Sequence, residues 1–571
     1  MRPQVDGGRY PVKRAVGDEV IVEADVFTDG HEAVGCELLW KHSSAKEWNL
    51  VPMEFRHNDH WVASFRVEQL GRYQYTVRGW TDAHLTWQRD LEKRKAAKQD
   101  ITVDLLIGKE LEDKPLEKLP YDKTLEVVVD PVRARFSAWY EMFPRSFGGL
   151  RGMVEMLPYV ERLGFDVLYL PPVHPVGTTA RKGKNNAVSA QPGDVGSPWA
   201  IGSRDGGHKA IEPSLGTFAD FDLLVKEANQ RKIEVALDIA FQCSPDHPYV
   251  KEHPEWFRAR PDGTIQYAEN PPKKYQDIYP FDFETPAWES LWAELKSVFE
   301  FWVGHGVKMF RVDNPHTKAF AFWEWAITEL KQAHPELIFL AEAFTRPRVM
   351  HKLAKLGFTQ SYTYFTWRNT KHELTEYFTE VTSHSSREYF RPNFWPNTPD
   401  ILHETLQHGG RPAFIVRAVL AATAAANYGI YGPAFELQER APREPGSEEY
   451  LNSEKYELKK WDLERADSLA PLISRLNVIR KENPALQSDW SLQFHPVDND
   501  QLIAYSKKQG ENEILVVVNL DVRNPQSGWI SFPPCEVHDL LSGGRWTWTS
   551  GRSYVELSPH KLPAHVFRVT R

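Results

Sequence analysis

The stretch VKMFRVDNPHTKAFAFWEW, residues 307–325, carries an arginine and an aspartate two positions apart at the end of an apolar run. Polar residues follow the run, and an aromatic-rich segment begins a few residues later. The pattern predicts a strand, a loop and a helix. Because residues two apart on a strand point to the same face, Arg311 and Asp313 are expected to lie side by side.

Seven other strand-like runs occur in the region 132–487, and amphipathic segments such as residues 287–306 separate them. Strands that alternate with helices predict a parallel sheet, and eight such units predict a (β/α)8 TIM barrel. The eight expected strands lie within residues 135–143, 167–175, 233–241, 307–313, 337–344, 358–365, 391–400 and 427–432.

Two of the expected strand-to-helix loops, residues 176–216 and 243–285, are unusually long. Loops of that length are usually functional or disordered, and in a barrel they lie on the face where active sites form. Their Gly, Asn and Lys content suits contact with a ligand.

The barrel is expected to be the central part of a multidomain chain. Short β-type runs over residues 1–105 predict an N-terminal Ig-like β-sandwich, and β-type runs over residues 488–571 predict a C-terminal antiparallel β-domain, again a β-sandwich. Residues 106–131 are polar and interrupted by prolines, so we expect a linker there. The barrel itself takes residues 132–487.

Composition excludes some classes of partner. The net charge of −9 argues against nucleic acid and against an anionic membrane surface, and no apolar run is long enough to span a bilayer. The three cysteines are far apart and show no zinc-binding spacing, which favours a reducing compartment, and we expect a cytoplasmic protein. The 20 tryptophans fit a sugar-binding cleft and aromatic packing in β-domains equally well.

Three carboxylates stand at the ends of three expected barrel strands: Asp313, Glu342 and Asp400. Retaining glycoside chemistry needs a carboxylate nucleophile and a carboxylic acid about 5–5.5 Å apart, and a third anion can stabilise the positive charge of the transition state. Arg311 would keep Asp313 ionised, and the apolar residues before Glu342 could raise its pKa. The alternative interpretation, that these are three ordinary surface acids, is simpler but has less support.

Several segments resemble the α-amylase family of glycosidases and transglycosidases. The whole chain is similar to one branch of it, the α-1,4-glucan:maltose-1-phosphate maltosyltransferases. The family signatures are FRVD (310–313), LAEAF (340–344) and FWPNTPD (394–400), and branch-like segments include GDVGSPWAIGS (193–203), QCSPDHP (242–248), AENPPKKYQDIYP (268–280) and EEYLNSEKYE (448–457).

The resemblance implies roles for individual residues. Asp313 would be the nucleophile that forms a β-maltosyl enzyme, Glu342 the general acid/base, Asp400 the transition-state stabiliser, and Arg311 the residue that orients Asp313. Hydrolytic members carry Asn-His and Asn-His-Asp where this chain has Gln242-Cys243 and Asn397-Thr398-Pro399-Asp400. The two missing histidines argue against a plain amylase.

The resemblance also implies a donor pocket. Phosphate brings about two negative charges to the anomeric carbon, so cations and hydrogen-bond donors should surround it. The residues implied for the phosphate site are Lys182, Lys455 and Tyr456; Gln242, Asn270 and Tyr275 complete the donor pocket, and Asn186 lies near the sugar. Lys184 is expected to be an ordinary solvated lysine.

The implied reaction moves maltosyl units from α-maltose 1-phosphate to a maltooligosaccharide or α-glucan and releases phosphate, with no organic cofactor and no metal. An α-glucan hydrolase or a maltose/trehalose isomerase on the same barrel is the alternative enzyme, and a non-catalytic carbohydrate-binding protein is the alternative from another class. Relatives carry a helical insert before the barrel that contributes to dimerisation. Residues 106–131 leave room only for a reduced insert, so a homodimer remains open.

Overall fold

The computed structural model describes residues 1–112, 115–271, 273–383 and 385–571 of the chain. These residues form two compact units, Met1–Val132 and Arg133–Arg571.

The first unit is built mainly from two β-sheets. Its strands are β1 (Val12–Ala15), β2 (Glu19–Asp25), β3 (Ala33–His42), β4 (Asn49–Pro52), β5 (Glu54–Phe55), β6 (His60–Arg66), β7 (Gly71–Asp82), β8 (Leu119–Pro120) and β9 (Leu125–Asp130). The larger sheet has the order β1-β9-β7-β3-β4, with β8 paired to β7, and the smaller has the order β2-β6-β5. Val20, Val22 and Ala24 of β2 are buried and alternate with more exposed residues, as expected for a strand with one face on a core.

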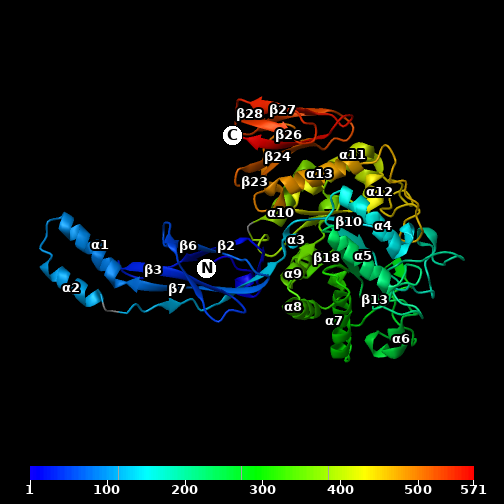
Figure 1. Cartoon of the computed structure of the whole chain (residues 1–571), viewed down its shortest axis with the longest axis horizontal. Coiled ribbons are helices and arrows are strands. Elements are labelled where there is room, and N and C mark those ends of the chain that lie inside the picture. Colours follow the sequence, from blue (N-terminus) through cyan, green and yellow to red (C-terminus); the bar gives the residue numbers. More distant parts are fainter. Residues whose placement is uncertain (113–114, 272, 384) are drawn as a thin grey trace. The chain divides into compact units, whose positions relative to one another are not determined.

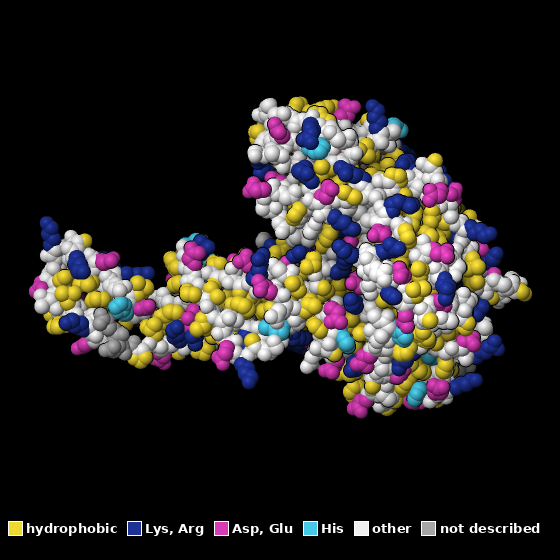
Figure 2. Space-filling view, in the orientation of Figure 1, with side chains coloured by type: hydrophobic (Ala, Val, Ile, Leu, Met, Phe, Trp, Pro, Cys, Tyr) yellow, Lys and Arg dark blue, Asp and Glu magenta, His cyan; other side chains and the backbone are white. Residues whose placement is uncertain are grey.

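Two helices, α1 (Ala83–Ala96) and α2 (Thr102–Glu112), follow β7 in the first unit. The indole N–H of Trp87 donates to the carbonyl oxygen of Asp104 at 2.6 Å, and Arg94 forms an ion pair with the Asp104 carboxylate. The opposite side of α2 is apolar and exposed: Val103 is 66 % and Leu106 58 % accessible. Figure 2 shows hydrophobic side chains gathered over these helices.

The expected division into a sandwich over 1–105 and a linker over 106–131 differs from the structure. Residues 83–112 are mostly helical, and residues 125–130 form β9, which lies inside the larger sheet between β1 and β7. The charged segment of α1 has no apolar periodicity, so its sequence does not distinguish a solvated helix from a linker. β9 pairs with β1, which lies more than a hundred residues earlier in the chain. Local sequence patterns cannot predict a pairing between such distant segments.

The second unit contains the predicted barrel, and the fold class is confirmed. Its strands are β10 (Ser137–Glu141), β11 (Val167–Leu170), β12 (Glu234–Ile239), β17 (Met309–Asp313), β18 (Ile338–Glu342), β19 (Gln360–Ser361), β20 (Asn393–Phe394) and β21 (Asn427–Tyr431). They pair in parallel in the order β19-β18-β17-β12-β11-β10-β21-β20. A parallel bridge between Ser361 and Pro392 joins the two ends of this sheet and closes the barrel.

Most helices of this unit cover the outside of the barrel, and large side chains fill the inside, where they contact Ala134 of the first helix. The helices are α3 (Val132–Arg135), α4 (Gly149–Arg162), α5 (Phe218–Gln230), α7 (Trp288–Gly304), α8 (Phe320–Ala333), α9 (Pro347–Lys355), α10 (Lys371–Thr382), α11 (Glu404–Ala424), α12 (Gly432–Glu436) and α13 (Ala470–Glu482). Figure 1 shows α4, α5, α7 and α8 around the strands. Trp139, Tyr169, Met309, Leu340 and Trp395 meet in the interior, which is a packed core.

The two long loops contain only short elements. The loop after β12 carries β13 (Gln242–Cys243), α6 (Pro248–Glu252), β14 (Ala268–Asn270), β15 (Lys273–Tyr275) and β16 (Tyr279–Pro280). β13 pairs with β16 and β14 pairs with β15, so this loop folds back on itself twice.

The last part of the second unit is a β-domain. Its strands are β22 (Gln493–His495), β23 (Leu502–Gln509), β24 (Asn512–Asn519), β25 (Gln526–Ser531), β26 (Cys535–Asp539), β27 (Arg545–Trp548), β28 (Arg552–Leu557) and β29 (Ala564–Thr570), arranged as a six-stranded sheet and the pair β25-β28. The ammonium of Lys371 on α10 donates to the carbonyl oxygens of Val497 and Asn499 at 3.0 Å, which ties this domain to the barrel. Among the described helices, none is both long and apolar enough for a bilayer span.

Candidate active site

A cavity of about 1250 Å³ opens at the carboxyl ends of the barrel strands. Both long loops contribute to its wall, as does the segment that follows α12. Asp313, Glu342 and Asp400 all line it, so the structure brings the three predicted carboxylates to one site.

Asp313 and Glu342 end two neighbouring strands in direct register, β17 and β18. Adjacent strands lie about 4.8 Å apart, so the two carboxyl groups face the same cavity as close neighbours. The Nη1 atom of Arg311 donates to Oδ1 of Asp313 at 2.8 Å, and its Nη2 atom lies 3.7 Å from Oε1 of Glu342. Arg311 is itself buried behind the cavity, where Oδ2 of Asp238 accepts from its Nη1 atom at 3.0 Å.

The two neighbouring carboxyl groups have pKa values shifted in opposite directions. Burial opposes ionisation of Asp313, but the charges of Arg311 and then Lys318 outweigh it, and the pKa of Asp313 is lowered. Burial raises the pKa of Glu342 to about 8, since the attraction of Arg311 is partly cancelled by the negative charge of Asp313. At neutral pH one group is therefore an anion and the other is mostly a protonated acid.

Asp400 is held by a lysine that lies 55 residues further along the chain. The Nζ atom of Lys455 donates to both carboxylate oxygens of Asp400, at 2.7 and 2.9 Å. Burial lowers the pKa of Lys455, but the Asp400 charge outweighs burial and the net shift is upward. The same ammonium lies 4.9 Å from the ring centre of Trp199 and 6.0 Å from that of Tyr456.

The other predicted binding residues lie around the same cavity. Those that line it are Lys182, Asn186, Gln242, Tyr275, Lys455 and Tyr456. Gln242 donates from Nε2 to the carbonyl oxygen of Trp199 at 3.1 Å. Asn270 ends β14, and its side chain lies outside the described residues.

The sequence analysis assigned no role to several residues that line the cavity, among them Asn314, Lys318 and Asp277. Asn314 has a left-handed backbone (φ 41°), donates from its backbone N–H to Glu342 at 3.2 Å, and donates from Nδ2 to Asp313 at 3.2 Å. Lys318 follows on the same loop, and Asp277 is buried with an Oδ1 atom that accepts no hydrogen bond from the described residues. The position of Asn314 directly after the nucleophile candidate was a usable signal, whereas nothing local marks Asp277.

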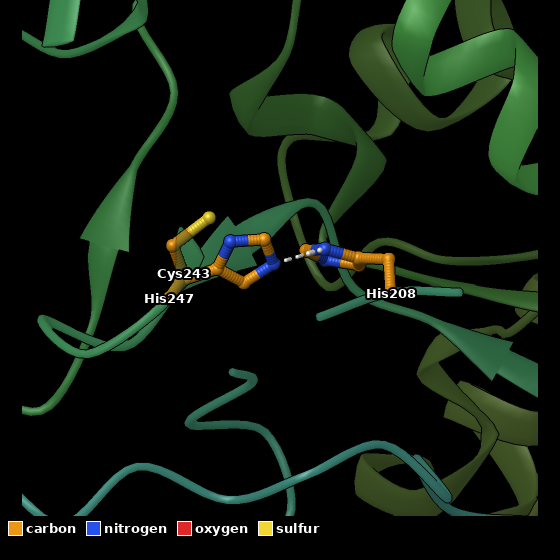
Figure 3. A group of neighbouring side chains, drawn as sticks. All are labelled: His208, Cys243 and His247. Atoms are coloured by element: carbon orange, nitrogen blue, oxygen red, sulfur yellow. Dashed lines mark hydrogen bonds between the residues drawn. The ribbon is translucent and has the colours of Figure 1, made fainter. Parts of the chain in front are cut away.

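A buried group of His208, Cys243 and His247 has metal-ligand chemistry, with its potential ligand atoms within 4.8 Å of one another (Figure 3). The backbone N–H of Tyr249 donates to Nδ1 of His247 at 3.0 Å, so the single proton of the neutral ring is on Nε2. That proton points to Nδ1 of His208 at 3.0 Å, and Nε2 of His208 donates to the carbonyl oxygen of Ala240 at 2.9 Å. Burial lowers the pKa of both histidines, which keeps them neutral.

A metal ion would need the lone pair of His247 at the nitrogen that carries this proton. If the proton moved to Nδ1, two N–H groups, that of His247 Nδ1 and the backbone N–H of Tyr249, would point at each other with no acceptor between them. The residues therefore do not fit a metal. The histidines instead connect the two long loops. Gly202 and Gly207 fit this contact, because a Cβ atom at either position would lie within 2.3 Å of the His247 ring.

Three family models match the chain. Residues 1–142 match the model of domain N/S of α-1,4-glucan:maltose-1-phosphate maltosyltransferase, and residues 126–390 match the α-amylase catalytic domain. Residues 494–569 match a model described as GLGE, C-terminal.

Named relatives match over nearly the full length. A protein of Chlorobaculum tepidum named α-1,4-glucan:maltose-1-phosphate maltosyltransferase is 51 % identical over 639 aligned positions, which cover 99 % of this chain and 95 % of that protein. A protein of Methylacidiphilum infernorum with the same name is 48 % identical and covers 100 % of this chain and 95 % of its own length. Both alignments are longer than the 571 residues here, so this chain is shorter than those relatives over the matched region.

Solved structures with this fold include the α-amylase from Lactobacillus plantarum. It matches with a TM-score of 0.62 and 19 % identity, covering 77 % of this chain and 100 % of the amylase. The maltogenic α-amylase AmyB from Thermotoga neapolitana matches with a TM-score of 0.61, 19 % identity and 77 % coverage of this chain and 100 % of that one. At this identity the similarity establishes the fold.

Proposed function

Since the chain belongs to the α-1,4-glucan:maltose-1-phosphate maltosyltransferase family, we propose that it transfers maltosyl units from α-maltose 1-phosphate to the non-reducing end of α-1,4-glucans and releases phosphate. The observation that carries the proposal is the pair Asp313 and Glu342, in direct register and with opposite pKa shifts. A nucleophile beside a protonated acid is what double displacement at a glycosidic carbon requires.

In the first step, the Asp313 carboxylate attacks the anomeric carbon. The new bond joins an Asp313 oxygen to C1, the bond from C1 to the phosphate oxygen breaks, and phosphate leaves with the electron pair. Arg311 and Asn314 donate to the two carboxylate oxygens and so fix their direction. Glu342 gives its proton to the departing phosphate oxygen, and this step leaves its carboxylate ionised for the second step. Because phosphate is a good leaving group, the rate gains little from this acid assistance.

In the second step, Glu342 acts as a base. It takes the proton of the acceptor 4-hydroxyl as that oxygen attacks C1, and the Asp313 carboxylate is released. Two inversions retain the α-configuration. Asp400, oriented by Lys455, would stabilise the positive charge that develops at C1 in both steps.

We assign donor recognition to the residues around the cavity. Polar side chains around a cavity suit the hydroxyls of a maltosyl unit. Those that line the cavity and that we assign are Lys182, Asn186, Gln242, Tyr275, Asp277, Lys455 and Tyr456. We add Asn270 on the resemblance alone.

We also propose that two copies of the chain associate through the apolar face of α2. Val103, Leu106 and Ile107 lie on one side of this helix and are 66, 58 and 43 % accessible. A second copy of the first unit would bury them.

The function is tested by phosphate release from α-maltose 1-phosphate, with and without a short maltooligosaccharide. We expect release that depends on the acceptor, products that grow by two glucose units, and a loss of at least about 10³-fold in Asp313→Ala. Cleavage of maltooligosaccharides without phosphate release would establish a hydrolase instead. Glucan binding without turnover by the wild-type chain would establish a non-catalytic protein.

A further inference from the structure

A second cavity, of about 1020 Å³, shares none of its lining residues with the active-site cavity. Three segments form its wall: part of α11, the residues directly after α12, and the residues before α13. Among the described residues that line it, five are cationic and three are acidic, a net charge of +2 in a chain whose overall charge is −9. We call this space the basic cavity, and its cationic residues are Arg411, Arg440, Lys459, Lys460 and Arg465.

Hydrogen bonds to backbone oxygens hold the three segments of the wall together. The carbonyl oxygen of Asp467 accepts from Nη1 of Arg411 and from Nε2 of Gln438, the latter at 2.7 Å. Nη2 of Arg465 donates to the carbonyl oxygen of Leu437. Each segment is therefore bonded to another, and the basic cavity has a defined wall.

A bend in α11 makes room for one of the cations. Gly410 has a positive φ of 58° at this bend, and Pro412 follows two residues later. A Cβ atom at Gly410 would lie 3.2 Å from Nη1 of Arg440, so the guanidinium of Arg440 packs against the backbone there. Arg440 is thereby held beside the segment that carries Arg411.

The five cations differ in whether acidic side chains neutralise them. Nε of Arg465 donates to Oδ1 of Asp467 at 2.6 Å. The ammonium of Lys459 lies 3.9 Å from a carboxylate oxygen of Glu439. The three that pair with no carboxylate of the described residues are Arg411, Arg440 and Lys460. Like charges gathered in one cavity repel one another, and a bound anion offsets that repulsion.

These features favour a phosphate monoester as the ligand. Such an ester carries about two negative charges at neutral pH, which matches the net charge of the basic cavity, and its oxygens accept from arginine and lysine donors. The volume leaves room for the organic part of the ester. A neutral glucan fits less well, because it needs open aromatic faces. Trp461 is the one aromatic side chain among the described lining residues, and it is half-buried with the Lys459 ammonium 5.3 Å from its ring centre.

We propose that the basic cavity binds a small phosphate monoester and that the bound ester stabilises the segment that carries Lys455. The indole N–H of Trp461 donates to Oε1 of the buried Glu454 at 3.2 Å, and Oε2 of Glu454 accepts from the Tyr431 hydroxyl at 2.6 Å. Glu454 directly precedes Lys455, whose ammonium donates to Asp400 in the active site. A ligand that orders Trp461 therefore acts on the segment that reaches the catalytic carboxylates.

Glucose 6-phosphate is the probe, and glucose and inorganic phosphate are the comparison ligands. Hydrogen–deuterium exchange of the full chain, read by mass spectrometry of its peptides, shows where each ligand protects the backbone. We expect glucose 6-phosphate to protect peptides that cover residues 437–441 and 454–467, and glucose to protect neither. Equal protection by inorganic phosphate would overturn the ester and leave a site for free phosphate.

Two variants test the cations and the charge of the wall. Arg440→Gln with Lys460→Gln removes two unpaired charges, and we expect the Kd for glucose 6-phosphate, from the concentration dependence of the protection, to rise about 10- to 100-fold. Asp462→Asn removes an acid that forms no ion pair with the described residues, and it should lower this Kd about two- to fivefold. None of these residues lines the active-site cavity, so phosphate release without added ester should stay within about twofold of wild type.

Arg204→Gln with Lys226→Gln is the matched control, because it removes the same two charges at exposed positions outside both cavities. It should bind glucose 6-phosphate as the wild type does. Equal weakening in the two double variants would show attraction to the overall charge and would overturn the site, as would a wild-type chain whose peptides stay unprotected. A chain that binds the ester but releases no phosphate from α-maltose 1-phosphate would contradict the proposed function and leave the site in place, so the two failures are distinguishable.

Discussion

At the scale of single residues, the sequence predicts those contacts in the site that join residues two positions apart on one strand. Arg311 and Asp313 are two apart on β17, and their contact at 2.8 Å follows from that spacing. The ion pair of Asp400 with Lys455 joins positions that no local pattern relates. The resemblance implies that Lys455 lies in the phosphate site, and in the structure its ammonium donates to Asp400.

Replacing the acid/base residue should separate the two half-reactions. In Glu342→Gln the Asp313 carboxylate can still displace phosphate from C1, but no base activates the acceptor hydroxyl. We expect the maltosyl enzyme to accumulate, with turnover reduced by about 10²-fold or more. Intact mass after mixing with α-maltose 1-phosphate should show one added maltosyl unit. An unmodified mass at every time point would contradict the scheme, and Asp313→Ala gives the reference without an adduct.

The raised pKa of Glu342 should also appear in the stability of the protein. Its pKa is about 8 in the folded protein against an ordinary value of 4.5, so between these pH values the folded state holds a proton that the unfolded state has lost. The free energy of unfolding from this group therefore falls as the pH rises from about 5 to 8. Thermal unfolding of wild type and Glu342→Gln over this range should show a Tm advantage of the variant that grows with pH. A constant difference would contradict the shifted pKa.

At the scale of elements, the barrel strands were predictable because each is an apolar run followed by a polar loop. The weakest region is where the barrel closes, since β19 and β20 are only two residues long. Closure depends there on Gln360, whose Nε2 atom donates to the carbonyl oxygen of Ala134 at 3.0 Å and to Oδ1 of Asn427 at 3.1 Å. Its Oε1 atom accepts from Asn393 at 2.9 Å. The sequence shows that Gln360 is a polar residue within an expected strand, but it does not show which groups Gln360 hydrogen-bonds.

Removing the Gln360 amide should destabilise the barrel. Gln360→Ala leaves several buried polar groups without partners, and we expect the free energy of unfolding to fall by about 2–4 kcal/mol. Urea unfolding followed by tryptophan fluorescence measures the change. Gln230→Ala, at the exposed end of α5, should change it by less than about 0.5 kcal/mol. Equal effects of the two changes would show that the network adds nothing to closure.

At the scale of the whole molecule, the sequence predicted the structural class of each domain. It did not predict where the N-terminal β-domain ends. The (β/α)8 barrel between β-rich regions follows from the alternation of patterns along the chain. The helices α1 and α2 and the strand β9 lie where a sandwich end and a linker were expected. The position of β9 depends on its pairing with β1 and β7, and α1 contacts β3, where Oγ1 of Thr86 accepts from the backbone N–H of Ala33. Local sequence patterns do not specify these contacts.

The apolar face of α2 gives a prediction about assembly. If a second copy covers it, Val103→Ser with Leu106→Ser should shift a homodimer toward monomer, because burial of two large apolar side chains in each copy is lost. Light scattering after size-exclusion chromatography measures the mass, and Lys109→Ser on the same helix is the matched polar change. A dimer that persists in the double variant would exclude α2 as the contact.

The position of β9 has a consequence for the order in which the chain can fold during its synthesis on the ribosome. The larger sheet of the first unit has β9 between β1 and β7, so β1 has no neighbour in that sheet until residues 125–130 have left the exit tunnel. β10 begins at Ser137, only a few residues later. Nascent chains arrested before residue 125 should therefore stay sensitive to protease at β1. Those long enough to expose Asp130 should become resistant before any barrel strand has found its partner.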